Sequence, residues 1–347
     1  MRSYIDAVKF IVHSLLGDRL KATVKEQPLG AGDELLDSFV YLPRRKTPRG
    51  TILAIHGMAA RAHNDPRLSV ICRAFSACGY AVVSPLYPDI AGFRIDSGTI
   101  DRIVDTVKAV TADKGLCPGG KLSIFAPSFS AGMAMIAASQ AEVRDMVDSI
   151  CSVGTYSNVD SAVEYLLAGQ DIDDYGRLII LRNFITHAPG FSKNIPDVLH
   201  AGILDNGLHR SVPELPLHLE RLSGRERRKL TRLLGEPDFR LMQWQRILER
   251  SRKIRKLLRD LSVVSRLEGL RAPVALIHGA EDRVIPPTES ILLNDRLRHH
   301  KVRSRLVITP LLSHGDISMG LNAIMEILRV VWLFAFFFHH ASAREAA

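Results

Sequence analysis

Between residues 51 and 154, short apolar runs alternate with longer segments in which apolar positions recur at helical spacing. The expected strands lie at residues 51–55, 80–84 and 122–126, and the expected helices at residues 68–78 and 100–112. Strands that are apolar at nearly every position are typical of a sheet that is buried on both faces. Because strands and helices alternate, the pattern predicts a mostly parallel sheet with helices on both faces.

The segment from residue 155 to residue 267 has a different pattern, with long helical periodicity and few strand-like runs. Within it we expect one helix over residues 239–262, because its apolar residues fall mostly at three- and four-residue steps. These residues are Trp244, Ile247, Leu248, Ile254, Leu258 and Leu261. The pattern divides the chain into a lead-in with an amphipathic helix (1–30), the first part of a core (31–154), a basic helical insertion (155–267) and the second part of the core (268–347).

Both ends of the chain contain apolar segments. Near the N-terminus, helical spacing is followed by Tyr4, Val8, Ile11 and Leu15. We expect an amphipathic helix that ends near Gly17 and packs on the core. The charges within this segment and the lack of a small-residue cleavage site are not typical of a secretory signal peptide. The C-terminal run at residues 330–338 is much shorter than the ~20 residues of a membrane-spanning helix, so we expect it to pack against the sheet, with contact to lipid as the alternative.

The chain has 347 residues, of which 46% are hydrophobic, and this is enough for one enzyme-sized core with an insertion. Its net charge of +9 is concentrated between residues 221 and 271, where there are sixteen Lys and Arg but only six Asp and Glu. This excess has three interpretations: a solvated face, a surface that attracts anionic lipid headgroups, or one that attracts an anionic substrate such as an acyl-CoA. Nucleic acid is not expected as a partner, because no recognition motif or aromatic platform accompanies the basic residues.

The cysteine content argues against a disulfide-stabilised protein and against a zinc protein. The four cysteines are Cys72, Cys78, Cys117 and Cys151. They show no metal-binding spacing and have no paired histidines nearby, so we expect neither a zinc site nor a disulfide framework, and no cofactor. Because no secretory signal is expected, the predicted location is the cytoplasm, and peripheral contact with the inner membrane face is the alternative.

A serine-containing turn follows the apolar run at residues 122–126. The turn has the sequence Ser128-Phe129-Ser130-Ala131-Gly132. A sharp turn from strand to helix needs small residues two positions before and two positions after its apex. Ser130 meets this condition with Ser128 and Gly132, so we take Ser130 as the candidate nucleophile. Ser128 is the alternative apex, flanked by Ala126 and Ser130, but Gly132 would then lie inside the following helix.

Two further candidate residues follow expected strands. The apolar run at residues 274–277 leads into Asp282, and the run at residues 306–308 is followed by His314. The chain order of serine, acid and histidine differs from the orders in chymotrypsin and subtilisin. We take Ser130, Asp282 and His314 as the candidate catalytic triad. The alternative acids are Glu281 and Asp316.

These motifs resemble those of the α/β-hydrolase superfamily, in its branch of serine esterases, lipases and thioesterases, from about residue 50 to the C-terminus. The resemblance implies an α/β-hydrolase fold, and the helical insertion lies where the family carries its cap. It also implies that the turn His56-Gly57-Met58 forms part of an oxyanion hole, with the backbone N–H groups of Met58 and Ala131 as donors. Ser128 departs from the family pattern, in which glycine is commonest at that position.

The resemblance, the helical insertion and the apolar terminal segments favour a serine hydrolase that cleaves a carboxylic ester of a hydrophobic or lipid-like acyl group through an acyl-enzyme. Thioester cleavage or acyl transfer on the same triad is the first alternative. A non-catalytic ligand-binding protein with the same fold is the second. The expected partner is therefore a small hydrophobic ester or thioester, and no metal is expected.

Overall fold

The computed structural model describes residues 1–17, 22–44, 47–170, 172–312 and 321–341. Within these residues, eight strands form one sheet in the order β1-β4-β6-β5-β7-β8-β9-β10. The strands are β1 (Thr23–Glu26), β4 (Ser38–Leu42), β5 (Thr51–Ala54), β6 (Ala81–Pro85), β7 (Leu122–Pro127), β8 (Val147–Val153), β9 (Val274–Gly279) and β10 (Ser304–Thr309), and a separate hairpin joins β2 (Leu29–Ala31) to β3 (Glu34–Leu36). β4 pairs antiparallel with β1 and β6, whereas the other neighbours in the sheet pair parallel. The predicted mostly parallel sheet is confirmed.

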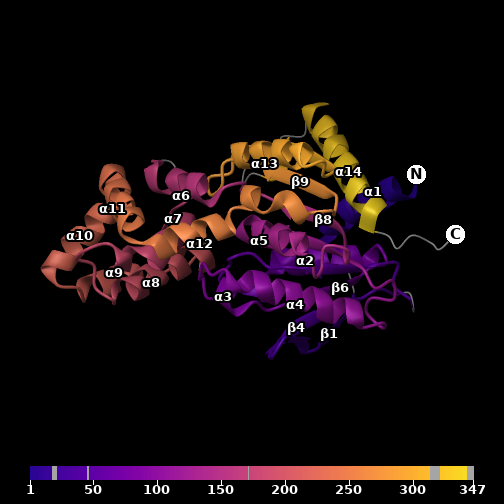
Figure 1. Cartoon of the computed structure of the whole chain (residues 1–347), viewed down its shortest axis with the longest axis horizontal. Helices are drawn as coiled ribbons and strands as arrows, with labels where there is room; N and C mark the ends of the chain where they lie inside the picture. The colour runs from indigo at the N-terminus through magenta and orange to yellow at the C-terminus, as the bar shows by residue number, and fades with distance from the viewer. Residues whose placement is uncertain (18–21, 45–46, 171, 313–320, 342–347) are drawn as a thin grey trace.

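Helices cover both faces of this sheet (Figure 1). One face carries α1 (Arg2–Leu16), α2 (Pro66–Ala77) and α14 (Leu321–Ala341), and the other carries α4 (Gly98–Ala112), α5 (Ser128–Ser139) and α13 (Pro287–His299). Successive side chains of a strand point to opposite faces, so Ile52 of β5 packs with α1 and α2 while Leu53 packs with α4 and α5. The predicted layers of helix, sheet and helix are therefore also confirmed.

The segment between β8 and β9 is helical, and Figure 1 shows that it extends away from the sheet at the end opposite α1 and α14. Its helices are α6 (Val159–Ala168), α7 (Asp174–Phe184), α8 (Ile195–Leu208), α9 (Leu215–Glu220), α10 (Gly224–Gly235), α11 (Pro237–Arg250) and α12 (Arg252–Leu261). The prediction of one helix over residues 239–262 is wrong, because α11 ends before Ser251. The Ser251 side chain accepts a hydrogen bond from the N–H of Ile254 and so begins a new helix.

The two ends of the helical insertion lie against each other and against the core. The N–H of Val264 donates to the carbonyl of Ser157 at 3.1 Å. The buried carboxylate of Glu289, in the first turn of α13, accepts hydrogen bonds from the N–H groups of Ser157 and Asn158 at 2.8 and 3.0 Å. Because α13 packs on the sheet, these bonds fix the entry and exit of the insertion relative to the core.

The terminal helices pack on the same face of the sheet. α1 ends before Gly17, which has a left-handed φ of 58°, as predicted. The prediction of which side of α1 is buried is wrong, however. The helix packs on the core through Ala7 and Phe10, whereas Tyr4 and Val8 are exposed. Phe10 stacks on Phe75 of α2 with 4.4 Å between ring centroids, and this aromatic contact selects the buried face.

The predicted run at residues 330–338 lies in the C-terminal half of α14, where Leu333, Phe337 and Phe338 are buried. Its expected packing against the sheet is confirmed. The apolar part of this helix is longer than the sequence pattern suggested: the window Ile324–Ala341 is long and apolar enough to cross a membrane by length and composition alone, and 33% of it is buried inside the protein.

Candidate active site

The serine turn has its apex at Ser128. β7 ends at Pro127 and α5 begins at Ser128, whose φ of 55° lies in the left-handed region that few non-glycine residues adopt. Holding a residue there costs on the order of 1–3 kcal/mol, and such residues cluster at active sites. The small residues two positions away are Ala126 and Ser130, and both are buried. The prediction of Ser130 as the apex is therefore wrong, and the alternative apex, Ser128, agrees with the observed turn.

Pro127 explains why the turn occurs at this residue. β7 is a central strand that pairs with β5 on one side and β8 on the other. Proline has no N–H to donate, so it cannot lie inside a central strand without loss of a ladder hydrogen bond. The strand therefore ends at Pro127, and the chain turns at the next residue. Pro127 is visible in the sequence, but only the structure shows that β7 is a central strand with a partner on each side.

Ser130 has a structural role in the turn. Its side chain is fully buried, and its Oγ donates a 2.6 Å hydrogen bond to the carbonyl of His56, in the turn after β5. Ser128 and Phe129 are only partly buried. The Ser130 hydroxyl thus joins the first turn of α5 to the turn after β5, while Ser128 is partly exposed.

Gly132 also has a role that the sequence did not indicate. A Cβ at this position would lie 2.4 Å from Cζ of Tyr156, which follows β8. The Tyr156 ring stacks on Phe129 with 5.3 Å between centroids and an interplanar angle of 22°. Gly132 therefore makes room for the aromatic ring that supports Phe129, and it is not one of the small residues flanking the apex.

The backbone donors beside Ser128 differ in part from those predicted. Ala131 is the fourth residue of α5, and regular helical bonding directs its N–H to the carbonyl of Pro127. The prediction of Ala131 as an oxyanion donor is therefore wrong. Phe129, which directly follows the apex, has no acceptor for its N–H within the helix. Gly57 lies against the turn, since a Cβ there would be 3.4 Å from Cγ of Pro127, and this contact brings the Met58 segment next to Ser128.

His56 holds the turn after β5 in place. Its buried ring accepts a 3.0 Å hydrogen bond from the N–H of Tyr87 at Nε2. Because Nε2 accepts, Nδ1 carries the proton, and it lies 2.9 Å from the carbonyl oxygen of Gly57. Burial lowers the pKa of His56 to about 4, so the ring is neutral at neutral pH. His56 therefore positions Gly57 and Met58 and is not a proton carrier.

Asp282 lies on the turn after β9, as predicted. Its Oδ1 accepts hydrogen bonds from the N–H groups of Val284 and Ile285 at 2.8 and 3.0 Å, and its Oδ2 lies 3.4 Å from Nε2 of His278. Burial by itself would raise the pKa of Asp282, but the hydrogen bonds from His278 and the two N–H groups outweigh it and hold the pKa below its usual range. The carboxylate is therefore charged and fixed in orientation.

The position of Asp282 relative to the sheet follows from Gly154. Gly154 ends the β8 segment with a φ of 60°, and a Cβ there would lie 3.2 Å from Oδ2 of Asp282. Glu281, the neighbouring alternative acid, is exposed. Because β5, β7, β8 and β9 are parallel neighbours, the turns that carry Met58, Ser128 and Asp282 lie at the same edge of the sheet.

The candidate base His314 and the alternative acid Asp316 lie outside the described residues. The chain is described up to Leu312, which lies beside Gly279 at the end of β9, 3.6 Å from the position of a Cβ there. The assignment of His314 stays a prediction.

Helix α7 of the insertion contacts two of the site's turns. The Tyr175 hydroxyl donates a hydrogen bond to the carbonyl of Met58, and the N–H of Asp173 donates to the carbonyl of Arg283 at 3.2 Å. The N-cap and first turn of α7 therefore link the Met58 segment with the Asp282 turn. A helix of the insertion is thus bonded directly to the backbone that carries the candidate oxyanion donor.

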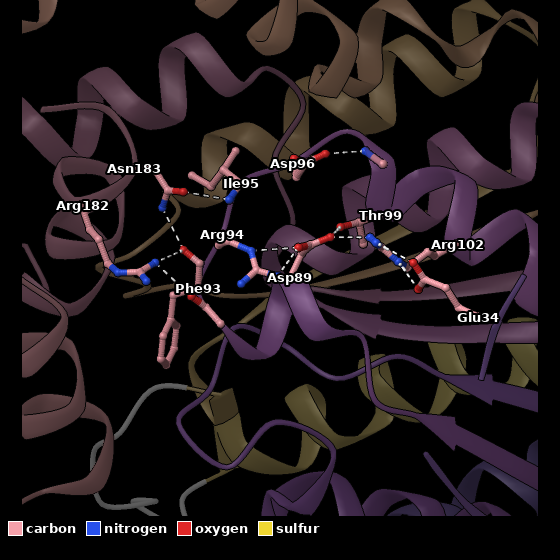
Figure 2. Close-up of polar contacts among 12 residues, drawn as sticks. Glu34, Asp89, Phe93, Arg94, Ile95, Asp96, Thr99, Arg102, Arg182 and Asn183 are labelled. Carbon is pink, nitrogen blue, oxygen red and sulfur yellow. Dashed lines mark hydrogen bonds and ion pairs between the residues drawn. The ribbon is translucent and has the colours of Figure 1, made fainter. Parts of the chain in front are cut away.

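Figure 2 shows the attachment of the other end of α7 to the loop after α3 (Pro88–Ala91). Asn183 donates to the carbonyl of Phe93 at 2.8 Å and accepts from the N–H of Ile95 at 2.9 Å, and Arg182 donates to the carbonyl of Gly92 at 2.9 Å. Phe93 has a left-handed φ of 55°, and these bonds hold it there. α7 is therefore fastened to the core at both ends.

No protein-family model matches this sequence, and no curated protein sequence matches it either. Solved structures match it in fold. The acylaminoacyl peptidase of Pyrococcus horikoshii is 15% identical over 96% of this chain, with a TM-score of 0.53, and this chain spans 44% of that protein. An esterase of Pyrobaculum calidifontis is 14% identical over 96% of this chain and 91% of its own, with a TM-score of 0.54. EstE1, a carboxylesterase cloned from a metagenomic library, is 14% identical over 99% of this chain and 98% of its own, with a TM-score of 0.52.

The chain has the α/β-hydrolase fold. In this fold the nucleophile occupies a strained turn between a central strand and the following helix. In this chain that position belongs to Ser128, between β7 and α5. At identities of 14–15% the similarity extends to the fold alone.

Proposed function

We propose that this α/β-hydrolase-fold protein is a serine hydrolase with Ser128 as its nucleophile, acting on carboxylic esters of hydrophobic acyl groups. The observation that carries the proposal is the backbone of Ser128: a partly exposed serine held at a φ of 55° on the turn after a central strand. Strain of this kind persists where the surrounding structure enforces it, and here it presents a hydroxyl at the edge of the sheet where Asp282 also lies.

In the proposed reaction, His314 takes the proton of Ser128 Oγ as this oxygen attacks the carbonyl carbon of the ester. The N–H groups of Met58 and Phe129 bind the resulting oxyanion, and loss of one such donor costs about 3–4 kcal/mol of barrier. The C–O bond to the alcohol then breaks, and His314 returns the proton to the leaving oxygen. Water repeats the attack on the acyl-enzyme. Asp282, charged because its pKa is held low, stabilises the imidazolium.

The aromatic pair beside the nucleophile supports a hydrophobic acyl group. Phe129 directly follows Ser128, is partly exposed and stacks on the buried ring of Tyr156. An acyl chain at Ser128 would meet apolar surface there, which favours binding by removal of that surface from water. The thioester alternative draws its support from a different feature, the basic residues of the insertion, which suit an anionic acyl-CoA.

Labelling with a fluorophosphonate probe tests the nucleophile. We expect one adduct per chain, located on Ser128 by mass spectrometry, and complete loss of labelling in Ser128→Ala. Ser130→Ala is the matched control two residues away: it removes only the hydrogen bond to His56, so the protein should still be labelled on Ser128, at a lower rate. An adduct on Ser130 would overturn the assignment. Absence of any adduct on the folded protein would favour the non-catalytic alternative.

A substrate panel then separates the reaction classes. Nitrophenyl esters from acetate to palmitate, the corresponding acyl-CoA thioesters and an acylated peptide anilide would be compared by kcat/KM. The proposal expects the esters to be preferred and the rate to rise with acyl length up to the limit of the site. Faster turnover of acyl-CoA would favour the thioesterase alternative, and faster turnover of the anilide would favour a peptidase. Ser128→Ala should lower each measured rate by about a thousandfold or more.

A further inference from the structure

The outward face of α1 is a continuous apolar stripe. On this helix the residues Tyr4, Ile5, Val8, Val12, Leu15 and Leu16 are between 43% and 79% exposed. They recur at three- and four-residue steps and so share one side of the helix. The core-facing side is formed by the buried residues Ala7 and Phe10. α1 therefore has two apolar sides, of which the protein buries only one.

A second set of exposed apolar residues lies on α14, which packs beside α1. Phe10 of α1 lies 4.6 Å from Phe334 of α14 between ring centroids. The exposed apolar residues of α14 are Ile324, Met325, Ile327, Leu328 and Trp332. Many exposed apolar residues on two adjacent helices are typical of an interaction surface in a soluble protein. We refer to the exposed residues of α1 and α14 together as the terminal patch.

The charges around the terminal patch are mostly positive. Asp6, the acid of α1, is buried and paired with Arg49 at 2.7 Å. Lys9 on the same helix is exposed. At the border of α14, the guanidinium carbon of Arg305 lies 4.1 Å from the centroid of the Trp332 ring. Apolar residues, interfacial Tyr and Trp, and exposed cations form the combination found on helices that lie at the surface of an anionic bilayer.

The basic residues of the insertion do not belong to this surface. Figure 1 shows α10 and α11 at the opposite end of the molecule's longest axis from α1 and α14. Several of these basic residues are also paired with acids of the insertion, such as Lys256 with Asp260 at 2.6 Å and Arg232 with Glu236 at 2.9 Å. Among the described residues, the terminal patch also has more exposed large apolar residues than the insertion, where they are Leu208, Val212, Leu217 and Met242.

We propose that the terminal patch binds the surface of a bilayer that contains anionic lipids, with α1 and the first half of α14 lying in the interface. The helices lie on the membrane and do not span it, because the second half of α14 packs its buried residues Leu333, Phe337 and Phe338 against the sheet. Withdrawal of this half from the protein would expose that core to water. This proposal does not depend on the reaction proposed for Ser128.

Flotation with vesicles tests the proposal on the full chain. The vesicles contain phosphatidylcholine alone or with about 30 mol% phosphatidylglycerol. We expect binding to the anionic vesicles, weaker binding at high salt, and a loss of binding of about tenfold or more in the double variant Val8→Glu/Val12→Glu. The matched control is Val212→Glu in the insertion, where the valine is 74% exposed. It makes the same kind of change outside the terminal patch and should bind like the unaltered protein.

Tryptophan emission provides a second readout. The chain has two tryptophans: Trp244 is buried in the insertion and Trp332 is 40% exposed on the terminal patch. Anionic vesicles should shift the emission to shorter wavelength, and Trp332→Phe should remove this shift. Circular dichroism on heating shows that each variant folds. Leu15→Glu, at a residue that is 79% exposed, replaces the double variant if that variant is unstable.

Three results would overturn the proposal. The first is no flotation with either vesicle at low or high salt. The second is unchanged flotation of Val8→Glu/Val12→Glu, with loss instead in Lys253→Gln/Lys256→Gln on α12. The third is a dimer by light scattering that Val8→Glu/Val12→Glu converts to a monomer, in the absence of vesicle binding. This last outcome would assign the terminal patch to a second copy of the chain.

Discussion

Replacement of Gly132 with alanine tests which serine is the apex of the turn, because it tests whether Gly132 packs against Tyr156. The test needs no assumption about activity. The added Cβ would lie 2.4 Å from Cζ and 2.6 Å from Oη of Tyr156, well inside the contact distance of about 3.5 Å for carbon atoms. Tyr156 has little room to move away, because it is buried, stacks on Phe129 and donates a 2.9 Å hydrogen bond to the carbonyl of Leu261. The overlap must therefore be relieved by strain in the core.

The magnitude of the effect follows from these contacts. Overpacking of a well-packed core costs about 1–3 kcal/mol, and displacement of the Tyr156 ring weakens a buried hydrogen bond worth about 1 kcal/mol. Alanine is favoured over glycine inside a helix by about 1 kcal/mol, which offsets part of this cost. We expect Gly132→Ala to lower the free energy of unfolding by about 2 kcal/mol.

Urea unfolding followed by circular dichroism measures this difference. The matched control is Gly235→Ala at the end of α10, because nothing lies within 4 Å of a Cβ at Gly235. Its stability should be unchanged or higher by up to about 1 kcal/mol. In a Tyr156→Leu background, Gly132→Ala should cost less, because the clashing ring is gone.

The opposite result has a clear meaning. If the turn had its apex at Ser130, Gly132 would be the small residue two positions after it, where alanine also fits. A Gly132→Ala protein as stable as the unaltered one would therefore refute the assignment of Gly132 to the packing of Tyr156.

Three further predictions concern the turns of the site. The pKa of Asp282 is lowered on folding, so its carboxylate stabilises the folded state at pH values above its unfolded pKa of about 4. This contribution is lost as pH falls through the folded pKa. The difference in free energy of unfolding between the unaltered protein and Asp282→Asn, measured by urea unfolding, should therefore shrink in acid. The pKa of His56 falls from 6.5 to about 4 on folding, so between these pH values the unfolded chain binds more protons than the folded one, and the free energy of unfolding should fall as pH drops from 6.5 to 4. In His56→Gln the free energy of unfolding should depend less on pH in this range. An unchanged slope would contradict a neutral buried ring. Tyr175→Phe removes the hydrogen bond to the Met58 carbonyl and should lower kcat on a soluble ester by about tenfold with little change in KM; a rise in KM alone would instead indicate a role in substrate binding.

Several parts of the site were predictable because they depend on local sequence. Asp282 follows an apolar strand, and its turn residues Val284 and Ile285 supply the N–H groups that orient it. The turn at His56 could be located in the same way, from an apolar strand that ends in His and Gly. The partner of His56 could not be predicted, because Tyr87 follows β6 and reaches His56 only through the pairing of β6 with β5. His278, in contrast, is a local partner that lies four residues before Asp282.

The sequence by itself determined the layers of the protein, the parallel strands and the order in which the turns occur, because periodicity and turn chemistry are local properties. The tertiary structure decided which serine is the apex. Side chains alternate along a strand with a period of two, so a shift of two residues from Ser130 to Ser128 leaves the hydrophobic pattern unchanged. The choice depends on where β7 stops pairing with β5 and β8, and that is set at Pro127. The buried face of α1 was likewise decided by its neighbours, because both sides of this helix are apolar and only Phe10 meets the aromatic core.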